Sequence, residues 1–218
     1  MTSALEAILS NRRLLIFDLD GTIADTSAIH AAAFQEAFAP FGVEVDYAPL
    51  AGLGTEQAVL QVLQTHRLTV DSLGQAEIVA TKRAVARRGL ASARLIDGAF
   101  GFLQIARRRH SLAMYSSGSR TTVKATLDCI GLSDWFDPLV TGADVVNPKP
   151  DPQGYRHVLE RTGTAPRDAL IFEDSAPGAA AARAAGIDVV MIVSGDCPIT
   201  AQCSDLSARW HELSMVLR

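Results

Sequence analysis

The chain has 218 residues, 48% of them hydrophobic, and a formal net charge of −4. This length suits one large domain, or a core domain with a smaller insert. The acidic balance, with no block rich in Lys or Arg, argues against nucleic-acid or anionic-membrane partners. No stretch approaches the roughly 18 uninterrupted apolar residues of a membrane span, and the N-terminus does not read as a signal peptide.

Cysteine usage favours a reducing compartment. The three cysteines, Cys129, Cys197 and Cys203, are odd in number and widely spaced. They therefore predict neither a disulfide framework nor a CxxC zinc site. We expect a cytoplasmic protein, with a monomer as the default state.

The first expected element is a buried strand at 13–17, a continuous apolar run (RLLIF) that ends in the polar turn 18–22 (DLDGT). Such a run followed by a Gly-containing turn is typical of a buried parallel strand and its loop. The next stretch, 26–94, favours helices and contains no strand run. We expect a helical insert there, with helices at 27–38, 55–66 and 72–88.

After the insert, apolar strand runs alternate with helical stretches. Strands are predicted at 112–115, 169–172 and 189–193, and helices at about 98–109, 119–130, 151–163 and 176–186. This alternation predicts βαβ units, and so an α/β fold with a doubly wound parallel sheet. The expected division is a core of residues 1–25 and 95–218 and a cap of residues 26–94.

Ligands of an open parallel sheet gather beyond the carboxyl ends of its strands. The polar residues expected at that edge are Asp18, Asp20, Ser116, Ser117, Glu173 and Asp174, together with Lys149 from the loop before the helix at 151. Clustered carboxylates repel one another and need a cation, and oxygen ligands without Cys or His point to Mg²⁺. The sequence thus predicts a magnesium site at this edge.

The same residue types suit phosphoryl transfer. Asp18 could act as a nucleophile and form an aspartyl-phosphate. Asp20 could protonate the leaving alcohol and then activate water. Ser116 and Lys149 are suited to binding the phosphoryl oxygens, and Ser117 is a further candidate.

Plainer interpretations compete with each assignment. Asp-Gly is a common turn pair, and Ser116, Ser117 or Asp174 could simply cap the helix that follows. Lys149 stands between two prolines that stiffen its position, which argues against an ordinary surface lysine. Asp144 follows a weak strand and could lie at the rim of the site.

With these motifs in order, the chain resembles the haloacid dehalogenase superfamily over nearly its whole length. The DxDGT motif is present at 18–22, a strand-ending Ser at Ser116, a Lys before a helix at Lys149, and an acidic pair at Glu173-Asp174. The resemblance implies a Rossmann-like core with a helical cap inserted after the first motif.

The resemblance also implies roles for the site residues. Asp18 would be nucleophile and metal ligand, and Asp20 an acid/base that offers its backbone carbonyl to Mg²⁺. Asp174, with Glu173, would complete the metal site. Family dehalogenases lack the second aspartate of the first motif, so Asp20 favours phosphate chemistry over carbon–halogen chemistry.

Within the superfamily, the segment DLDGTIADTSAIH looks like the branch that holds β-phosphoglucomutases and sugar-phosphate phosphatases. His30 matches the mutases' cap histidine, although it could equally be a core histidine. Thr55, which could be a helix N-cap, stands where the mutases carry the arginine that grips a second phosphate. This favours a phosphatase acting on a small phosphorylated metabolite. A mutase stays open, because Lys82, Arg83 or Arg87 could replace that arginine.

Two other classes of protein combine similar residues. Signalling receiver domains also use an acceptor aspartate, a hydroxyl, a lysine and an acidic pair on a doubly wound sheet, but they are shorter and carry the acidic pair on the first strand. A catalytically inactive binding protein on the same fold would not need all four motifs intact.

Overall fold

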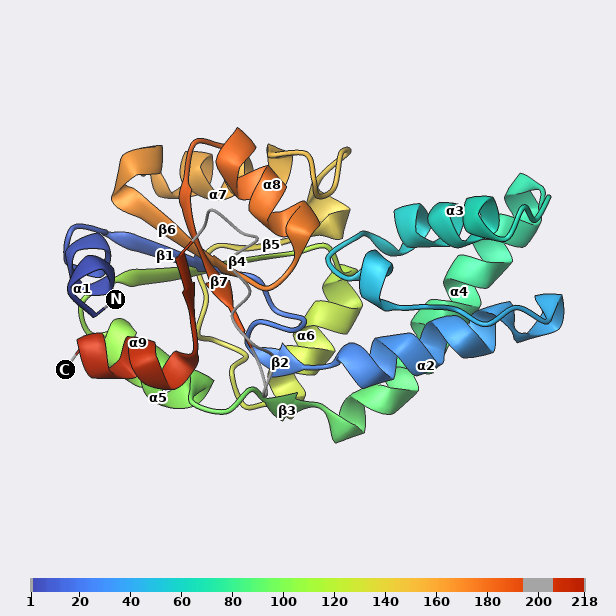
Figure 1. Ribbon diagram of the computed structural model, residues 1–218, viewed down its shortest axis with the longest axis horizontal. Coiled ribbons are helices and arrows are strands. Elements are labelled where there is room, and N and C mark those ends of the chain that lie inside the picture. Colours follow the sequence, from blue (N-terminus) through green and yellow to red (C-terminus); the bar gives the residue numbers. More distant parts are fainter. Residues whose placement is uncertain (1, 194–205, 218) are drawn as a thin grey trace.

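The computed structural model describes residues 2–193 and 206–217. A six-stranded sheet with the order β5-β4-β1-β6-β7-β8 forms its centre, and every neighbouring pair in it is parallel. Chain order reverses on either side of β1, as in a doubly wound sheet. The α/β class and the doubly wound parallel sheet predicted from the sequence are therefore confirmed (Figure 1).

The strands are short and apolar. Their bounds are β1 Leu14–Phe17, β4 Ser111–Ser116, β5 Leu139–Thr141, β6 Ala169–Glu173, β7 Asp188–Ile192 and β8 Leu206–Ala208. Helices cover both faces of the sheet, so successive strand residues enter different cores. Leu15 and Phe17 of β1 pack into one hydrophobic cluster, and Leu14 and Ile16 into the other.

Two layers of helices cover the sheet. One face packs on α1 (Thr2–Ser10), α5 (Ala99–Ala106), α6 (Arg120–Cys129) and α9 (Trp210–Val216), and the other on α7 (Gln153–Thr162) and α8 (Ala176–Ala184) (Figure 1). Trp210 anchors α9, since its ring packs among Phe17, Phe102 and Phe172 and its Nε1 donates to the Thr22 carbonyl at 2.8 Å.

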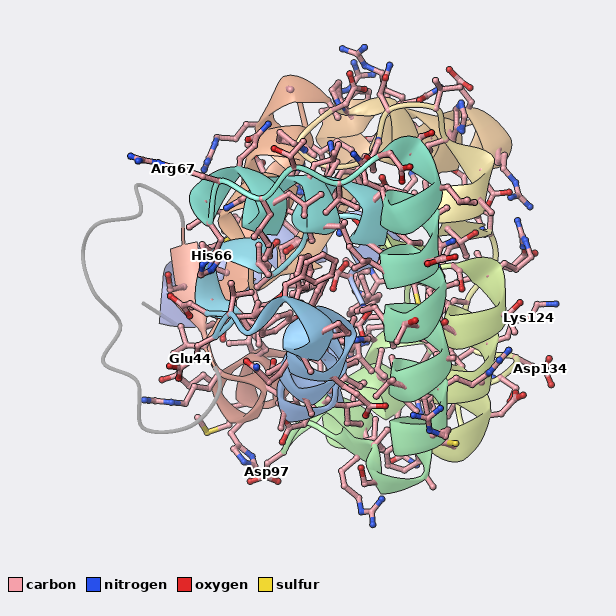
Figure 2. The ribbon with its side chains drawn as sticks, turned by 90° about the vertical axis from the view of Figure 1, so that its right-hand side faces the viewer. Glu44, His66, Arg67, Asp97, Lys124 and Asp134 are labelled. Atoms are coloured by element: carbon pink, nitrogen blue, oxygen red, sulfur yellow. The ribbon has the colours of Figure 1, made fainter. Side chains whose placement is uncertain are left out.

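The segment between β1 and β4 carries three further helices, α2 (Ser27–Phe38), α3 (Thr55–Thr65) and α4 (Ser72–Gly89). They lie beyond one end of the sheet and share their own hydrophobic cluster, built around Phe34, Phe38 and Val59 (Figure 1). Figure 2 views the molecule from this end, with the three helices in front of the core.

Both chain crossings between these helices and the sheet run through one small ladder. Strands β2 (Ala24–Asp25) and β3 (Arg94–Leu95) pair antiparallel, with Ala24 opposite Leu95 and Asp25 opposite Arg94. The two ends of the 26–94 insert therefore lie side by side in space.

Several elements were missed by the sequence analysis. They are α1, α9, β8 and the paired β2 and β3, while β5 was taken only as a weak strand. Cys129 is a free exposed cysteine, and Cys197 and Cys203 lie outside the described residues. Within the described ranges, no helix is long and apolar enough to cross a membrane.

Candidate active site

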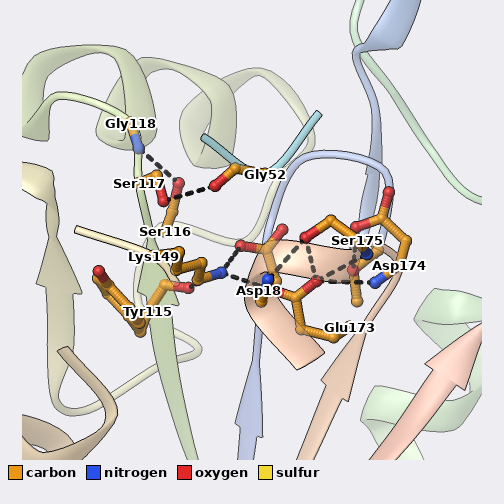
Figure 3. A network of polar contacts seen from close by, with 12 residues as sticks. Asp18, Gly52, Tyr115, Ser116, Ser117, Gly118, Lys149, Glu173, Asp174 and Ser175 are labelled. Atoms are coloured by element: carbon orange, nitrogen blue, oxygen red, sulfur yellow. Dashed lines mark hydrogen bonds and ion pairs between the residues drawn. The ribbon is translucent and has the colours of Figure 1, made fainter. Parts of the chain in front are cut away.

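The carboxyl ends of β1, β4 and β6 meet at one edge of the sheet, and α2 and α3 of the insert lie over this edge. Asp18 directly follows β1, Ser116 ends β4, and Glu173 ends β6 with Asp174 after it. Lys149 reaches the same place from the loop before α7. Figure 3 shows these side chains converging, as the sequence predicted.

Lys149 is the central cation of this site. Its side chain is completely buried, and Nζ donates to Asp18 Oδ1 and to Glu173 Oε1, both at 2.5 Å (Figure 3). The rings of Tyr115 and Tyr155 flank it, with centroids 4.9 and 5.3 Å from Nζ. Burial by itself lowers the pKa of a lysine, but the charges of Asp18 and Glu173 outweigh it and raise the pKa of Lys149 well above its usual value. Lys149 is therefore held as an ammonium.

Asp18 lies in a desolvated and crowded position. Burial raises its pKa, Lys149 opposes that rise, and the neighbouring carboxylates of Glu173, Asp174 and Asp20 add to it. One lysine thus leaves the negative charges of the site incompletely balanced. This is the electrostatic situation that a bound divalent cation relieves.

Glu173 is hydrogen-bonded to the protein through both of its carboxylate oxygens. Its Oε1 accepts from Lys149 and from the Tyr155 hydroxyl at 3.2 Å, and its Oε2 accepts from Asp174 N, Ser175 N and Ser175 Oγ at 2.9, 2.9 and 2.8 Å. Both carboxylate oxygens are fully engaged with the protein. In this structure Glu173 therefore fixes Lys149 and the turn after β6, and its place among the metal ligands stays a prediction.

Asp174 lies against the turn that follows β1. Its Oδ1 accepts from the Thr22 hydroxyl at 3.1 Å, and a Cβ placed on Gly21 would lie only 2.0 Å from its Oδ2. Gly21 also has a φ of +83°, in the region that favours glycine. Burial, and then the charge of Glu173, raise the pKa of Asp174 to about 7. The DxDGT turn therefore needs its glycine to let this carboxylate approach.

These donors fit Mg²⁺ through oxygen atoms alone. Across the described residues, no group of three or more His, Cys, Asp or Glu side chains is arranged to hold a metal. Two crowded carboxylates, those of Asp18 and Asp174, remain. Mg²⁺ commonly takes only one or two carboxylates and fills its octahedron with water and substrate oxygens. This set suits Mg²⁺, whereas the carboxylate of Asp20 is directed elsewhere.

Asp20 begins a polar chain that runs into the helical insert. Its Oδ1 accepts from the Thr26 hydroxyl at 2.7 Å and lies 3.1 Å from His30 Nε2. Lys82 Nζ lies 3.3 Å from His30 Nδ1. Because the ammonium can only donate, Nδ1 accepts and Nε2 carries the proton given to Asp20. The structure therefore joins His30 to Asp20, so His30 is not merely a core histidine.

These contacting side chains set the protonation state of Asp20. Burial by itself raises the pKa of Asp20, but the contacts with His30 and Thr26 and the charge of Lys82 outweigh it and lower the pKa to about 2. In this conformation Asp20 is a carboxylate. It has to leave His30 and Thr26 before it can protonate a leaving group.

The two serines after β4 play different parts. Ser116 is buried, lines the cavity beside Asp18, and its Oγ accepts from Gly118 N at 3.0 Å. Ser117 Oγ instead donates to the carbonyl of Gly52 at 2.9 Å, across to the insert (Figure 3). In this structure the Ser117 hydroxyl therefore binds the insert, and its role in phosphate binding stays a prediction.

A small cavity of about 40 Å³ remains between the sheet edge and the insert. From the core, Asp18, Asp20, Ser116, Ser117 and Gly118 line it. From the insert, His30, Phe34, Tyr47, Leu50, Gly52, Leu53, Thr55 and Lys82 line it. Thr55 thus reaches the site as expected. No sequence motif marks Phe34, Tyr47, Leu50 or Leu53, because their spacing is that of ordinary core residues.

Other residues considered from the sequence lie outside this cavity. Arg83 pairs with Glu56 at 2.6 Å, and neither Arg83 nor Arg87 lines the cavity. Asp144 accepts from the Thr141 backbone and hydroxyl and pairs with Arg120. Asp144 therefore closes a local turn, and Lys82 is the one cation that the described insert residues contribute to the cavity.

Gly52 is a point of close approach between the insert and the core. It has a φ of +81°, and a Cβ there would lie 2.2 Å from Ser175 Oγ. We expect Gly52→Ala to hold the insert away from the sheet edge and to lower kcat/KM at least about tenfold, since misplacement of about 1 Å near an active site can cost more than that.

A matched control separates closure from backbone strain. Gly42 has a similar φ of +66° and no atom within 4 Å of a Cβ placed on it. Steady-state kinetics of both variants should show the loss in Gly52→Ala only. An equal loss in Gly42→Ala would attribute the effect to the left-handed backbone instead.

Comparison with known proteins agrees with this geometry. The family model described as haloacid dehalogenase-like hydrolase matches residues 15–192. The chain is 30% identical to validoxylamine A 7'-phosphate phosphatase of Streptomyces hygroscopicus subsp. limoneus, over 80% of this chain and 83% of that protein. It is 28% identical to fructose-1-phosphate phosphatase YqaB of Escherichia coli, over 81% of this chain and 94% of that protein.

A solved structure shares the architecture. CbbY from Rhodobacter sphaeroides, in complex with phosphate, superimposes with a TM-score of 0.79 at 27% identity, covering 93% of this chain and 96% of that one. The match covers nearly the whole of both chains, so the overall architecture is shared by the two proteins.

Proposed function

Since this chain belongs to the haloacid dehalogenase-like hydrolases and is a phosphoric monoester hydrolase, we propose that it hydrolyses a small phosphorylated metabolite, of the sugar-phosphate kind, through an aspartyl-phosphate on Asp18. The observation that carries this proposal is the buried contact of Lys149 with Asp18, whose own side chain lines the cavity. In this view residues 26–94 form a cap domain over a core of 1–25 and 95–218.

The first step transfers the phosphoryl group to the enzyme. Lys149 binds Asp18 Oδ1, which leaves Oδ2 to attack phosphorus while the bond from phosphorus to the ester oxygen breaks. Asp20 gives its proton to that leaving oxygen, in general acid catalysis. Asp20 takes up this proton after it has left His30 and Thr26, because their contacts hold it as a carboxylate.

The second step releases phosphate. Asp20, now a carboxylate, takes a proton from water as the water oxygen attacks phosphorus and the bond to Asp18 breaks. Ser116 lines the cavity beside Asp18, and its hydroxyl can donate to a phosphoryl oxygen. Lys149, whose Nζ donates to Asp18, Glu173 and the Tyr115 carbonyl, offsets the negative charge from behind Asp18. The small cavity keeps bulk water away during the transfer.

Mg²⁺ would be held by Asp18, Asp174 and the Asp20 carbonyl, where it supplies positive charge that offsets the phosphoryl oxygens. The proposal of a phosphatase rather than a mutase is supported by the cavity lining. A bisphosphate intermediate needs a cation for its second phosphate, and Lys82 is already engaged with His30 and the Phe34 ring.

Phosphate release from p-nitrophenyl phosphate, fructose 1-phosphate and β-glucose 1-phosphate tests the proposal. We expect continuous turnover with Mg²⁺ and its loss in EDTA, restored by added Mg²⁺. A single equivalent of bound phosphate without turnover would instead indicate a receiver. Glucose 6-phosphate formed from β-glucose 1-phosphate would indicate a mutase.

A further inference from the structure

Two buried tyrosines flank Lys149, and they differ in what their hydroxyls contact. Tyr115 is the last but one residue of β4, and Tyr155 is the third residue of α7. Both side chains are completely buried, and their rings meet edge to face with centroids 5.0 Å apart. The Tyr155 hydroxyl donates to Glu173 Oε1 at 3.2 Å, whereas the Tyr115 hydroxyl has no hydrogen-bond partner within the described ranges. The same side chain therefore occurs here with and without a polar contact.

All three ammonium hydrogens of Lys149 are engaged by the protein. Nζ donates to Asp18 Oδ1, to Glu173 Oε1 and to the Tyr115 carbonyl, the last at 3.3 Å. The contacts with the two carboxylates have the same length, 2.5 Å. Lys149 is thus shared between the proposed nucleophile and a second carboxylate that does not line the cavity.

Glu173 competes with Asp18 for this ammonium, and its other contacts set how strongly it competes. Three donors from the turn after β6 bind its Oε2, on the side away from Lys149. On Oε1, the Tyr155 hydroxyl is the one donor besides Lys149 in the described part of the chain. A carboxylate oxygen that accepts from a second donor has part of its charge offset, so it attracts an ammonium less. Tyr155 therefore weakens the pull of Glu173 at the oxygen that contacts Lys149.

The packing of the two rings leaves the ammonium little other freedom. Their centroids lie 4.9 Å (Tyr115) and 5.3 Å (Tyr155) from Lys149 Nζ. Gly154 allows the Tyr115 ring to lie against the backbone of α7, because a Cβ there would be 2.1 Å from Tyr115 Cζ. With a ring on two sides, the ammonium can shift mainly along the line between the two carboxylates.

From these contacts we infer that Tyr155 is a positioning residue, which acts through Glu173 to keep Lys149 on Asp18. Without the hydroxyl, Oε1 would hold the ammonium more tightly, and Asp18 would lose the contact that leaves its Oδ2 directed at phosphorus. Misplacement of about 1 Å in an active site can lower a rate by about 100-fold. This inference rests on the proposed phosphatase function.

Tyr155→Phe tests the inference in steady-state kinetics with p-nitrophenyl phosphate. The change removes the hydroxyl and keeps the ring. We expect kcat to fall about tenfold, the size expected when a hydrogen bond to a charged group is lost. KM and the inhibition constant of inorganic phosphate should change by less than about twofold, since neither Tyr155 nor Lys149 lines the cavity.

Tyr115→Phe is the matched comparison. It removes the same hydroxyl group from the other tyrosine of the pair, and it keeps the ring and the carbonyl that contact Lys149. Because the lost hydroxyl has no partner, we expect the fall in kcat to be at least about fivefold smaller than in Tyr155→Phe. Calorimetry gives the melting temperature of each variant, and the kinetics are measured well below it.

Four results would overturn the inference. They are an equal fall in kcat in the two variants, a kcat of Tyr155→Phe within about twofold of the wild type, a change in KM as large as the change in kcat, and a Tyr155→Phe chain that does not fold. If the wild type releases no phosphate from p-nitrophenyl phosphate or from the sugar phosphates, the proposed function itself is wrong, and the inference is overturned with it. Turnover by the wild type together with an unchanged Tyr155→Phe refutes the role of Tyr155 alone.

Discussion

Asp18→Asn is expected to abolish turnover, with kcat lowered by about 10⁴-fold or more, as for other nucleophile replacements. An amide cannot form the acyl-phosphate bond, yet Asn keeps the shape of the buried side chain. Its carbonyl oxygen can still accept from Lys149, and it no longer repels Glu173 and Asp174. We therefore expect the fold to be retained, with phosphate release as the measurement.

Asp134→Asn provides a matched control for that change. Asp134 is exposed, projects from the edge of the molecule in Figure 2, and makes no contact with the cavity lining. Asp134→Asn removes the same charge as Asp18→Asn, but far from the cavity lining. It should therefore leave kcat and the melting temperature close to those of the wild type. Retained turnover in Asp18→Asn, with a normal response in Asp134→Asn, would exclude Asp18 as the nucleophile.

Gly178→Ala is expected to have the largest effect on stability. Gly178 is the third residue of α8, and a Cβ there would lie 1.7 Å from Glu173 Oε1 and 2.0 Å from its carboxyl carbon. Glu173 cannot move aside without breaking its bonds to Lys149, Tyr155 and Ser175. We expect a loss of about 3 kcal/mol, in the range for disruption of a buried polar network.

A chain of this size loses roughly 2–4 °C of melting temperature for each kcal/mol. The expected shift is therefore about 6–12 °C, measured by calorimetry, together with a lower kcat because Lys149 is displaced. Gly101→Ala is the matched control, since Gly101 also lies in a helix but has no atom within 4 Å of a Cβ placed on it. There alanine should be neutral or stabilising by up to about 1 kcal/mol. Equal behaviour of the two variants would contradict the steric argument.

The parts of the fold that follow local rules were predictable. The strand runs at 13–17, 112–115 and 169–172 lie within one residue of β1, β4 and β6. The helix at 27–38 has the predicted bounds, and those at 55–66 and 72–88 differ from α3 and α4 by one residue. Continuous apolar runs and turn residues report such elements directly.

Elements that depend on distant partners were not predictable. β2 and β3 have two residues each and exist because they pair across the 26–94 insert. β8 is a short edge strand beside β7. α9 is held by Trp210, whose indole donates a hydrogen bond to the carbonyl of Thr22, near the other end of the chain. None of these has a periodic pattern long enough to be read alone.

The site shows the same division. The residue types that carry charge were found because each follows a strand end, and those ends meet at one edge. The spacing of residues along the sequence does not show which partner each side chain contacts. Glu173 turns to Lys149 and Tyr155, and Ser117 turns to Gly52, because neighbours brought by the fold offer them better partners. Tyr47 and Lys82 reach the cavity only through packing of the insert.

The pairing of β2 with β3 has a consequence for how such an enzyme changes its substrate. Since the two ends of the 26–94 segment leave the sheet through adjacent hydrogen-bonded residues, the segment behaves as a cassette attached at a single place. The segment can be lengthened, shortened or exchanged without altering the distance between its two ends, which β2 and β3 hold together. A lineage can thus acquire a new substrate by replacing this segment, while Lys149, the proposed nucleophile Asp18 and the proposed magnesium ligands stay where they are.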